Sequence, residues 1–201
     1  MSQVQTDAKE QHPQLMMCRP QLCNLPDVRL PEGFSIRSYQ NGDAISWDRI
    51  NCDAFGWDPT QAQFEKRMKT DAANRDERIL FVCHHDEPVG TASAWPEAFY
   101  GPNTGTLHYV GVIHREAGKG LGYQISLAAL HQMVREHWKR VTLRTDDIRV
   151  PAIKLYLKLC FVPFLVHEGQ RQRWRNVFKR IQRPELIDEF KSQLEGPIQR
   201  T

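Results

Sequence analysis

Apolar and polar positions alternate along several short segments of the chain, which predicts β-strands. Residues 34–39 alternate as a half-buried strand does. Two further strands are predicted at residues 78–83 and 88–95, and the four residues between them suit an antiparallel hairpin. A turn at residues 101–105 then leads into a strand from Thr106 to Val112.

Other segments have the period of a helix. Asp43 can cap a helix that runs to Phe55, and a second helix is expected from residue 59 or 60 through Met68. The clearest helical period covers residues 123–138, directly after a group of glycines. The chain continues as a strand, a helix and a strand, at residues 140–145, 151–159 and 161–166. This order predicts an α/β fold in which helices cover a mixed β-sheet.

Three regions differ in composition. Residues 1–29 are polar, contain Pro13, Pro20 and Pro26, and predict an N-terminal extension that is loosely ordered or lies over the domain surface. Residues 30–180 predict one folded domain, which suits a chain of 201 residues with 40% hydrophobic side chains. Residues 181–201 predict a C-terminal helical tail, with an amphipathic helix at 184–194 that docks on the domain or on a second subunit, so a homodimer is compatible.

Composition narrows the functional classes. No apolar run approaches the roughly 18 residues of a membrane span, and the N-terminus lacks the apolar core of a secretory signal, so we expect a soluble, cytoplasmic protein. Five cysteines without a C-x-x-C pair indicate reduced thiols, and we expect no metal site. The net charge of +3 is small. The basic run at residues 170–183 is more typical of a solvated face than of a nucleic-acid site.

A glycine-rich loop, Ala117-Gly-Lys-Gly-Leu-Gly122, lies between a predicted strand and a predicted helix. Free backbone N–H groups and the positive end of the helix dipole meet there, which favours a phosphate. A Walker A loop is excluded because Gly120 follows Lys119, and a dinucleotide fingerprint is excluded because the glycines are spaced G-x-G-x-G. The alternative is a tight turn that uses glycine only for its conformation.

The segment from Tyr109 to Gly122 resembles motif A of the GNAT superfamily of acyl-CoA-dependent N-acetyltransferases. Two registers fit, and spacing favours Ala117-x-x-Gly120-x-Gly122, in which alanine replaces the usual Arg or Gln. Residues 152–161 resemble motif B of the same superfamily, with Arg149 at its Asn position and Cys160 at its Gly position. The resemblance covers about residues 34–166 and is similar to a little-studied bacterial branch.

This resemblance implies the GNAT fold, a mixed and mostly antiparallel central sheet flanked by helices, with a splay between two central parallel strands. It implies acetyl-CoA as the acyl donor, and Gly111 suits a bulge in the splayed strand. The alternative is a regular core strand. The residues it implies for binding CoA are Val110, Gly111, Val112, Ala117, Gly118, Lys119, Gly120, Leu121, Gly122, Arg149, Ala152 and Lys158.

The resemblance also implies catalytic roles. Tyr156 matches the general-acid position, and a phenol with a pKa near 10 is protonated at neutral pH; the alternative is an aromatic that only packs on CoA. His108 is the candidate general base, or else a packed strand histidine. Other candidate bases are Glu97, Asp146 and Asp147. Candidate walls of the acceptor site, which can equally be core, are Phe55, Trp57, Trp95 and Tyr100.

The predicted function is therefore transfer of an acetyl group from acetyl-CoA to a primary amine of a small molecule or peptide, directly and within a ternary complex. Two alternatives belong to other classes: a GNAT-like fold that binds CoA as a sensor or scaffold, and a nucleic-acid-binding module, whose affinity would fall steeply with salt. The amine itself is not predicted, because the region before motif A builds its pocket.

Overall fold

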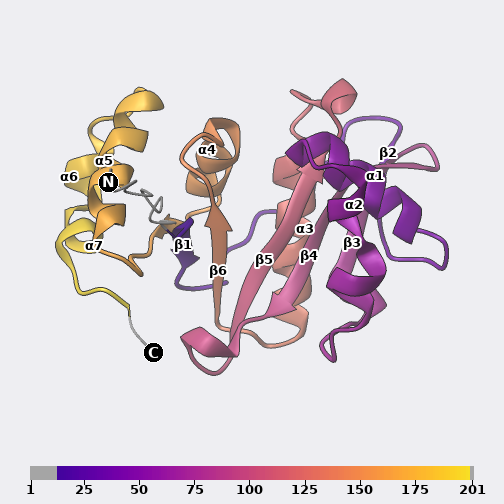
Figure 1. Ribbon diagram of the computed structural model, residues 1–201, viewed down its shortest axis with the longest axis horizontal. Helices are drawn as coiled ribbons and strands as arrows, with labels where there is room; N and C mark the ends of the chain where they lie inside the picture. Colours follow the sequence, from indigo (N-terminus) through magenta and orange to yellow (C-terminus); the bar gives the residue numbers. More distant parts are fainter. Residues whose placement is uncertain (1–12, 200–201) are drawn as a thin grey trace, which may run out of the picture.

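The structure is a computed structural model that describes residues 13–199, and these form one seven-stranded sheet with helices on both faces (Figure 1). The strand order is β2-β3-β4-β5-β6-β1-β7. The strands are β1 (Leu15–Arg19), β2 (Phe34–Ser38), β3 (Ile79–His84), β4 (Glu87–Pro96), β5 (Thr104–Val112), β6 (Arg140–Thr145) and β7 (Val162–Pro163). Within these residues β5 and β6 are parallel and every other neighbouring pair is antiparallel. The predicted fold class is confirmed.

Two helices enclose the half of the sheet made by β2 to β5. Helix α3 (Leu121–Arg135) lies behind the sheet in Figure 1, and α1 (Ala44–Phe55) lies in front of it. The side of α3 that carries Ile125 and Met133 is buried, and so is the side of α1 that carries Trp47 and Ile50. The hydrophobic core therefore has two layers, one on each face of these strands.

The second predicted helix is broken into two pieces. Helix α2 (Pro59–Ala62) ends at Gln63, whose φ of 47° is left-handed, and the π-helical turn η1 (Glu65–Lys69) follows. The Asp48 carboxylate accepts a hydrogen bond from the backbone N–H of Phe64 at 2.8 Å, which holds the second piece against α1. Short 3₁₀ turns occur as η2 (Asp76–Arg78), η3 (Ala98–Tyr100) and η4 (His114–Glu116).

The C-terminal part of the chain consists mainly of helices, and these pack on the β6 end of the sheet: α4 (Val150–Lys158), α5 (Gly169–Arg180), α6 (Leu186–Glu189) and α7 (Lys191–Glu195). The strand predicted at residues 161–166 shrinks to β7 because Pro163 has no N–H for a ladder. The helix predicted at 184–194 is divided at Phe190, whose ring lies 5.8 Å from that of Phe178 on α5.

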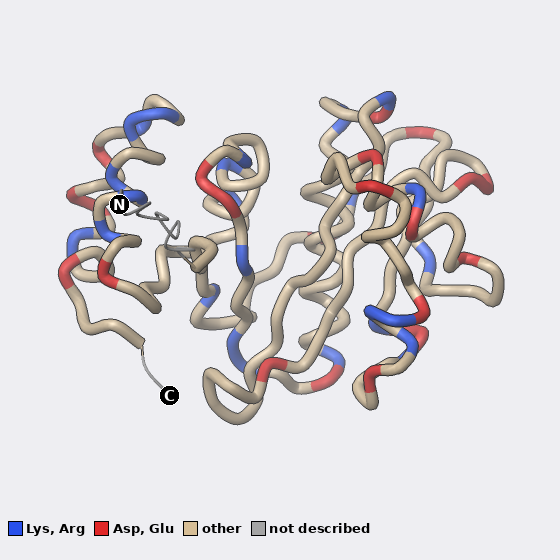
Figure 2. The backbone as a smooth tube through the Cα atoms, in the orientation of Figure 1, with Lys and Arg blue, Asp and Glu red and all other residues tan. Residues whose placement is uncertain are grey.

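Helix α5 buries Trp174 and Phe178, and several of the residues between and around them are basic (Figure 2). Several of these cations have carboxylate partners, such as Arg173 with Asp147 at 2.6 Å and Arg171 with Glu168 at 2.6 Å. Ion pairs and partial burial thus occupy part of the basic run. No helix in residues 13–199 combines the length and the apolar character that a membrane span requires.

The prediction that residues 1–29 form a loosely ordered or superficial extension is wrong for residues 15–19, which form β1. Residues 1–12 lie outside the described residues, but residues 15–19 are buried between β6 and β7, in register from Leu15 opposite Thr145 to Arg19 opposite Val141. The Arg19 guanidinium donates to the backbone carbonyls of Gln21, Cys23 and Leu159. A strand buried on both faces appears in sequence as one apolar run without alternation, so the period gave no signal.

After β1 the chain crosses the back of the sheet. The His131 ring and the Pro26 carbonyl lie 2.9 Å apart, and the Arg29 N–H donates to the Gln124 side chain at 2.8 Å. Both partners belong to α3, so the segment between β1 and β2 is fastened along that helix. It connects the two halves of the sheet.

We predict that Met17→Ala lowers the free energy of unfolding by about 2–5 kcal/mol, because it leaves a cavity in a fully buried strand. Glu32→Ala, at an exposed position, is the matched control and should change stability by less than about 0.5 kcal/mol. Urea unfolding measures both. Equal stabilities of the two variants would show that β1 is not an integral part of the sheet.

Candidate active site

The two parallel strands at the centre of the sheet separate after a short contact. Residues 104–106 of β5 pair with residues 140–142 of β6, and from Leu107 to Val112 the described chain offers β5 no partner on that side. Backbone N–H and C=O groups of β5 therefore face an opening. The predicted splay is present.

A bulge bends β5 where the strands part. Ser93 on β4 is opposite His108 and Thr91 is opposite Gly111, so Tyr109 and Val110 together face only Ala92. Tyr109 has a left-handed φ of 49°. The sequence predicted a bulge around Val110, Gly111 and Val112, and the structure places it at Tyr109 and Val110. Gly111 itself lies after the bulge, and a Cβ there would make a tight contact of 3.0 Å with the Cβ of Ala54 on α1.

A cleft of about 1090 Å³ lies in this opening, at the upper end of the roughly 300–1,000 Å³ usual for ligand sites. It is bounded by β5, the glycine loop, the start of α3, and α4. The structure brings most of the predicted residues together in its lining: Val110, Gly111, Val112, Ala117, Gly118, Gly120, Leu121, Gly122, Arg149, Ala152, Tyr156 and Lys158.

The glycine loop presents backbone donors to the cleft. Gly118 and Gly120 have φ values of 81° and 77°, which other residues adopt only with strain, and α3 begins at Leu121. The N–H groups of residues 118–122 make no hydrogen bond to a described group. Free donors at the positive end of a helix dipole are suited to phosphate.

Lys119 does not line the cleft, although the sequence predicted it to bind CoA. Its ammonium donates to the buried Glu116 carboxylate at 2.5 Å and lies 5.3 Å from the centre of the Phe34 ring. The hydrogen bond from Lys119 lowers the pKa of Glu116. A buried carboxylate needs a cation, and this requirement turns Lys119 away from the cleft.

Cations line the cleft from α4 instead. The Arg149 guanidinium lies 4.4 Å from the centre of the Phe55 ring, and the Lys158 ammonium lies 5.9 Å from that of Tyr123. Lys154, which the sequence analysis missed, also lines the cleft, one helical turn before Lys158. Its spacing of four residues from Lys158 was the available signal, because such residues share a helix face.

Tyr156 is 7% exposed and faces the cleft from α4, with its ring packed 6.0 Å from that of Phe161. Its hydroxyl has no hydrogen bond to a described residue. Burial raises the pKa of Tyr156 to about 12, although the charge of Arg149 acts in the opposite direction. The phenol is therefore protonated at neutral pH and its proton is free for a ligand.

His108 lies outside the cleft lining, on the face of the sheet covered by α1. Burial, followed by the charges of Arg144 and Arg67, lowers its pKa to about 4, so the imidazole is neutral at pH 7 and a weak proton acceptor. The other candidate bases do not line the cleft either. Glu97, Asp146 and Asp147 form ion pairs with Arg144, Arg149 and Arg173.

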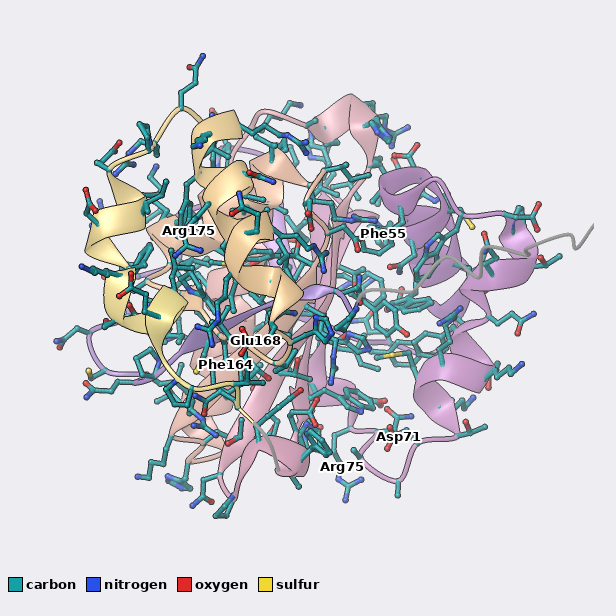
Figure 3. The ribbon with its side chains drawn as sticks, turned by 60° about the vertical axis from the view of Figure 1, so that its left-hand side comes forward. Phe55, Asp71, Arg75, Phe164, Glu168 and Arg175 are labelled. Atoms are coloured by element: carbon teal, nitrogen blue, oxygen red, sulfur yellow. The ribbon has the colours of Figure 1, made fainter. Side chains whose placement is uncertain are left out.

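The predicted acceptor walls do not all come together. Phe55 lines the cleft from the inward side of α1 (Figure 3), and its ring lies 4.9 Å from that of Trp57. Trp95 instead donates to Asp71 at 3.0 Å, and Tyr100 packs 5.4 Å from Phe164 by the turn before β5.

Tyr109, which was missed, has its ring 6.1 Å from that of Trp57. Only the bulge places it there. Residues 13–199 contain no group of three or more His, Cys, Asp or Glu side chains arranged for a metal ion.

The sequence of this chain matches a family of known acetyltransferases. The model of the Acetyltransferase (GNAT) family matches residues 44–161, and the chain belongs to this family. It is 31% identical to mycothiol acetyltransferases from Saccharomonospora viridis, over 68% of this chain and 48% of the relative, and from Thermomonospora curvata, over 76% and 52%. The chain thus spans about half the length of these curated relatives.

Solved structures share the fold. A GCN5-related N-acetyltransferase from Sphaerobacter thermophilus superposes with a TM-score of 0.60 at 22% identity, covering 76% of this chain and 49% of that one. A GNAT family acetyltransferase from Brucella melitensis, solved in complex with acetyl-CoA, has a TM-score of 0.51 at 17% identity, with coverage of 60% and 80%. At these identities the likeness concerns the fold.

Proposed function

We propose that this protein transfers an acetyl group from acetyl-CoA to a primary amine of a small molecule or peptide, directly within a ternary complex. One observation carries the proposal. A single cleft in the splay combines backbone N–H groups that are free to bind phosphate, an unpaired edge of β5 and a protonated tyrosine. The relatives named mycothiol acetyltransferase support acetyl as the transferred group.

The cleft offers groups that suit successive parts of acetyl-CoA. The pyrophosphate would take the N–H groups of residues 118–122, with Lys154 and Lys158 supplying positive charge. The pantetheine would pair with the unpartnered edge of β5 at residues 110–112, as an added strand does. A free N–H on that edge would also stabilise the oxyanion that develops on the thioester carbonyl.

Tyr156 would act as the general acid. The neutral amine attacks the thioester carbon, the tetrahedral intermediate collapses, and the carbon–sulfur bond breaks with both electrons leaving on sulfur. The thiolate takes the proton of the Tyr156 hydroxyl, which is free for it. The proton lost by the attacking nitrogen then restores the phenol through solvent.

The acceptor would enter between α1 and β5, past Phe55, Trp57 and Tyr109. The base role of His108 stays a prediction. Its position outside the cleft and its pKa of about 4 favour a route in which the amine loses its proton to water. The alternative function, a sensor that binds CoA without turnover, differs in one observable, the release of free CoA thiol in the presence of amines.

We predict that acetyl-CoA raises the melting temperature of the wild-type protein, because a ligand that binds the folded state stabilises it by about 2.7 kcal/mol at a hundredfold excess over Kd. Gly120→Asp should abolish most of this shift, since it places a carboxylate against the pyrophosphate. Gly120→Asn is the matched control, of equal size, neutral and tolerant of the left-handed backbone at 120. Equal shifts in the two variants would contradict the phosphate assignment.

Tyr156→Phe should retain the affinity for acetyl-CoA and lower kcat by at least about tenfold, because the ring survives and the donor hydroxyl is lost. This loss of kcat is small for the removal of a general acid, because a thiolate whose thiol has a pKa near 8.5 is a good leaving group without protonation. Single-turnover thiol release measures the chemical step. A wild-type rate there would make Tyr156 a packing residue.

His108→Gln tests the proton route. Because the imidazole titrates near pH 4, its charge does not change between pH 6 and 9, and the rate should rise over that range with the deprotonation of the amine alone. Wild type and variant should give pH profiles of one shape with the same amine. An inflection near pH 6–7 that only the wild type shows would establish His108 as the base.

A further inference from the structure

The acceptor side of β5 carries an uncompensated positive charge, and this feature goes beyond the acetyl transfer proposed above. The bulge turns His108 and Tyr109 to the same face of the sheet, with their ring centres 3.8 Å apart. The Tyr109 ring also contacts Trp47 at 4.8 Å and Trp57 at 6.1 Å. Trp57 and Tyr109 form a platform beside the cleft, and the fully buried Trp47 packs against Tyr109.

Arg67, from η1, lies on this platform. Its guanidinium is 4.9 Å from the centre of the Trp57 ring, its Nε donates to the Gln61 carbonyl at 2.7 Å, and its Nη1 donates to the Tyr109 hydroxyl at 3.4 Å. All three partners are neutral. No described carboxylate lies within ion-pair distance of Arg67, and its Nη2 has no described acceptor.

A second cation, Arg144, acts on His108. Arg144 projects from β6, and its charge and that of Arg67 both act on the His108 imidazole and lower its pKa. Arg144 has a partial partner in Glu97, through one contact of 3.2 Å. The imidazole is neutral, and of the two guanidinium groups that act on it only that of Arg144 has a described carboxylate partner.

The platform connects directly to the cleft. Phe55 lines the cleft and contacts Trp57, while Val110, which also lines the cleft, follows Tyr109 in the chain. An amine that reaches the thioester beside Val110 therefore has its remaining atoms close to the platform. The part of the acceptor that lies near Arg67 would meet a planar guanidinium group with free N–H donors. A carboxylate matches the geometry of these donors.

We propose that the acceptor carries a carboxylate near its amine, and that Arg67 binds this carboxylate on the Trp57–Tyr109 platform with Arg144 as the neighbouring charge. The proposal rests on the acetyl transfer proposed above and narrows the amine to the class of amino acids and acidic peptides. Arg67 is a specificity-determining residue in this account, and it touches the substrate without taking part in proton transfer.

The test uses the full chain with saturating acetyl-CoA and amino acids, each paired with its own primary amide. Wild type should give a higher kcat/KM for the acid. Arg67→Gln should lower kcat/KM for the acid by at least about tenfold, as loss of a charged hydrogen bond does, and leave the amide within about threefold. Arg67→Lys should retain part of the preference, because it keeps the charge but not the fork.

Arg75→Gln is the control for the loss of one positive charge. Arg75 also has no ion pair with a described carboxylate, does not line the cleft, and lies well away from Phe55 in Figure 3. It should leave both substrates unchanged. If Arg67→Gln affects acid and amide equally, or if wild type prefers the amide, the carboxylate site is wrong while the transferase proposal stands.

Two further outcomes separate the proposals. The ratio of kcat/KM for phosphoethanolamine to that for ethanolamine can be compared with the ratio for each acid to its amide. If the phosphoethanolamine ratio is the larger, the carboxylate assignment is overturned in favour of phosphate. If a folded protein that binds acetyl-CoA acetylates no amine, the transferase proposal fails. The carboxylate site is then tested separately, by saturation-transfer NMR of N-acetyl amino acids with CoA present. These amino acids should bind the wild type and bind Arg67→Gln more weakly. Equal binding to the two proteins would overturn the carboxylate site.

Discussion

The cleft exists because β5 and β6 separate at the centre of the sheet. Two parallel strands that pair over three residues and then part leave backbone donors and acceptors without partners, and such groups are costly unless water or a ligand satisfies them. The bulge at Tyr109 and Val110 bends β5 within the separated stretch, and Gly111 lets α1 approach the bent strand closely. The cleft, its glycine loop and Tyr156 are all arranged around this opening.

A splayed sheet also needs a second support, because β6 cannot rely on β5 along its whole length. The N-terminal strand β1 provides it by pairing with β6 along residues 141–145 and with β7 on its other edge. The following segment is fastened to α3 by Pro26 and Arg29, which links the two halves behind the opening. The far half of the cleft thus depends on residues that precede the match to the family, which begins at residue 44.

The sequence allowed prediction of the parts whose signal is local. The glycine loop, α3, β6 and α4 each have a period or a motif of their own, so Gly118 to Gly122 and Tyr156 could be placed in one site. Features that depend on tertiary packing could not be predicted. The apolar run of β1 has no alternation, Lys119 is held by Glu116, and the side on which Tyr109 projects depends on a bulge. The acceptor region is built mainly from such features.

We propose that acetyl-CoA binds in the splay with its sulfur at Tyr156, and a crystal structure of the full chain with CoA would test this. We expect phosphates on the N–H groups of residues 118–122, the pantetheine paired with β5 at Val110 and Val112, and the thiol within hydrogen-bond distance of the Tyr156 hydroxyl. CoA bound on another surface, or bound in the cleft with its sulfur away from Tyr156, would contradict it.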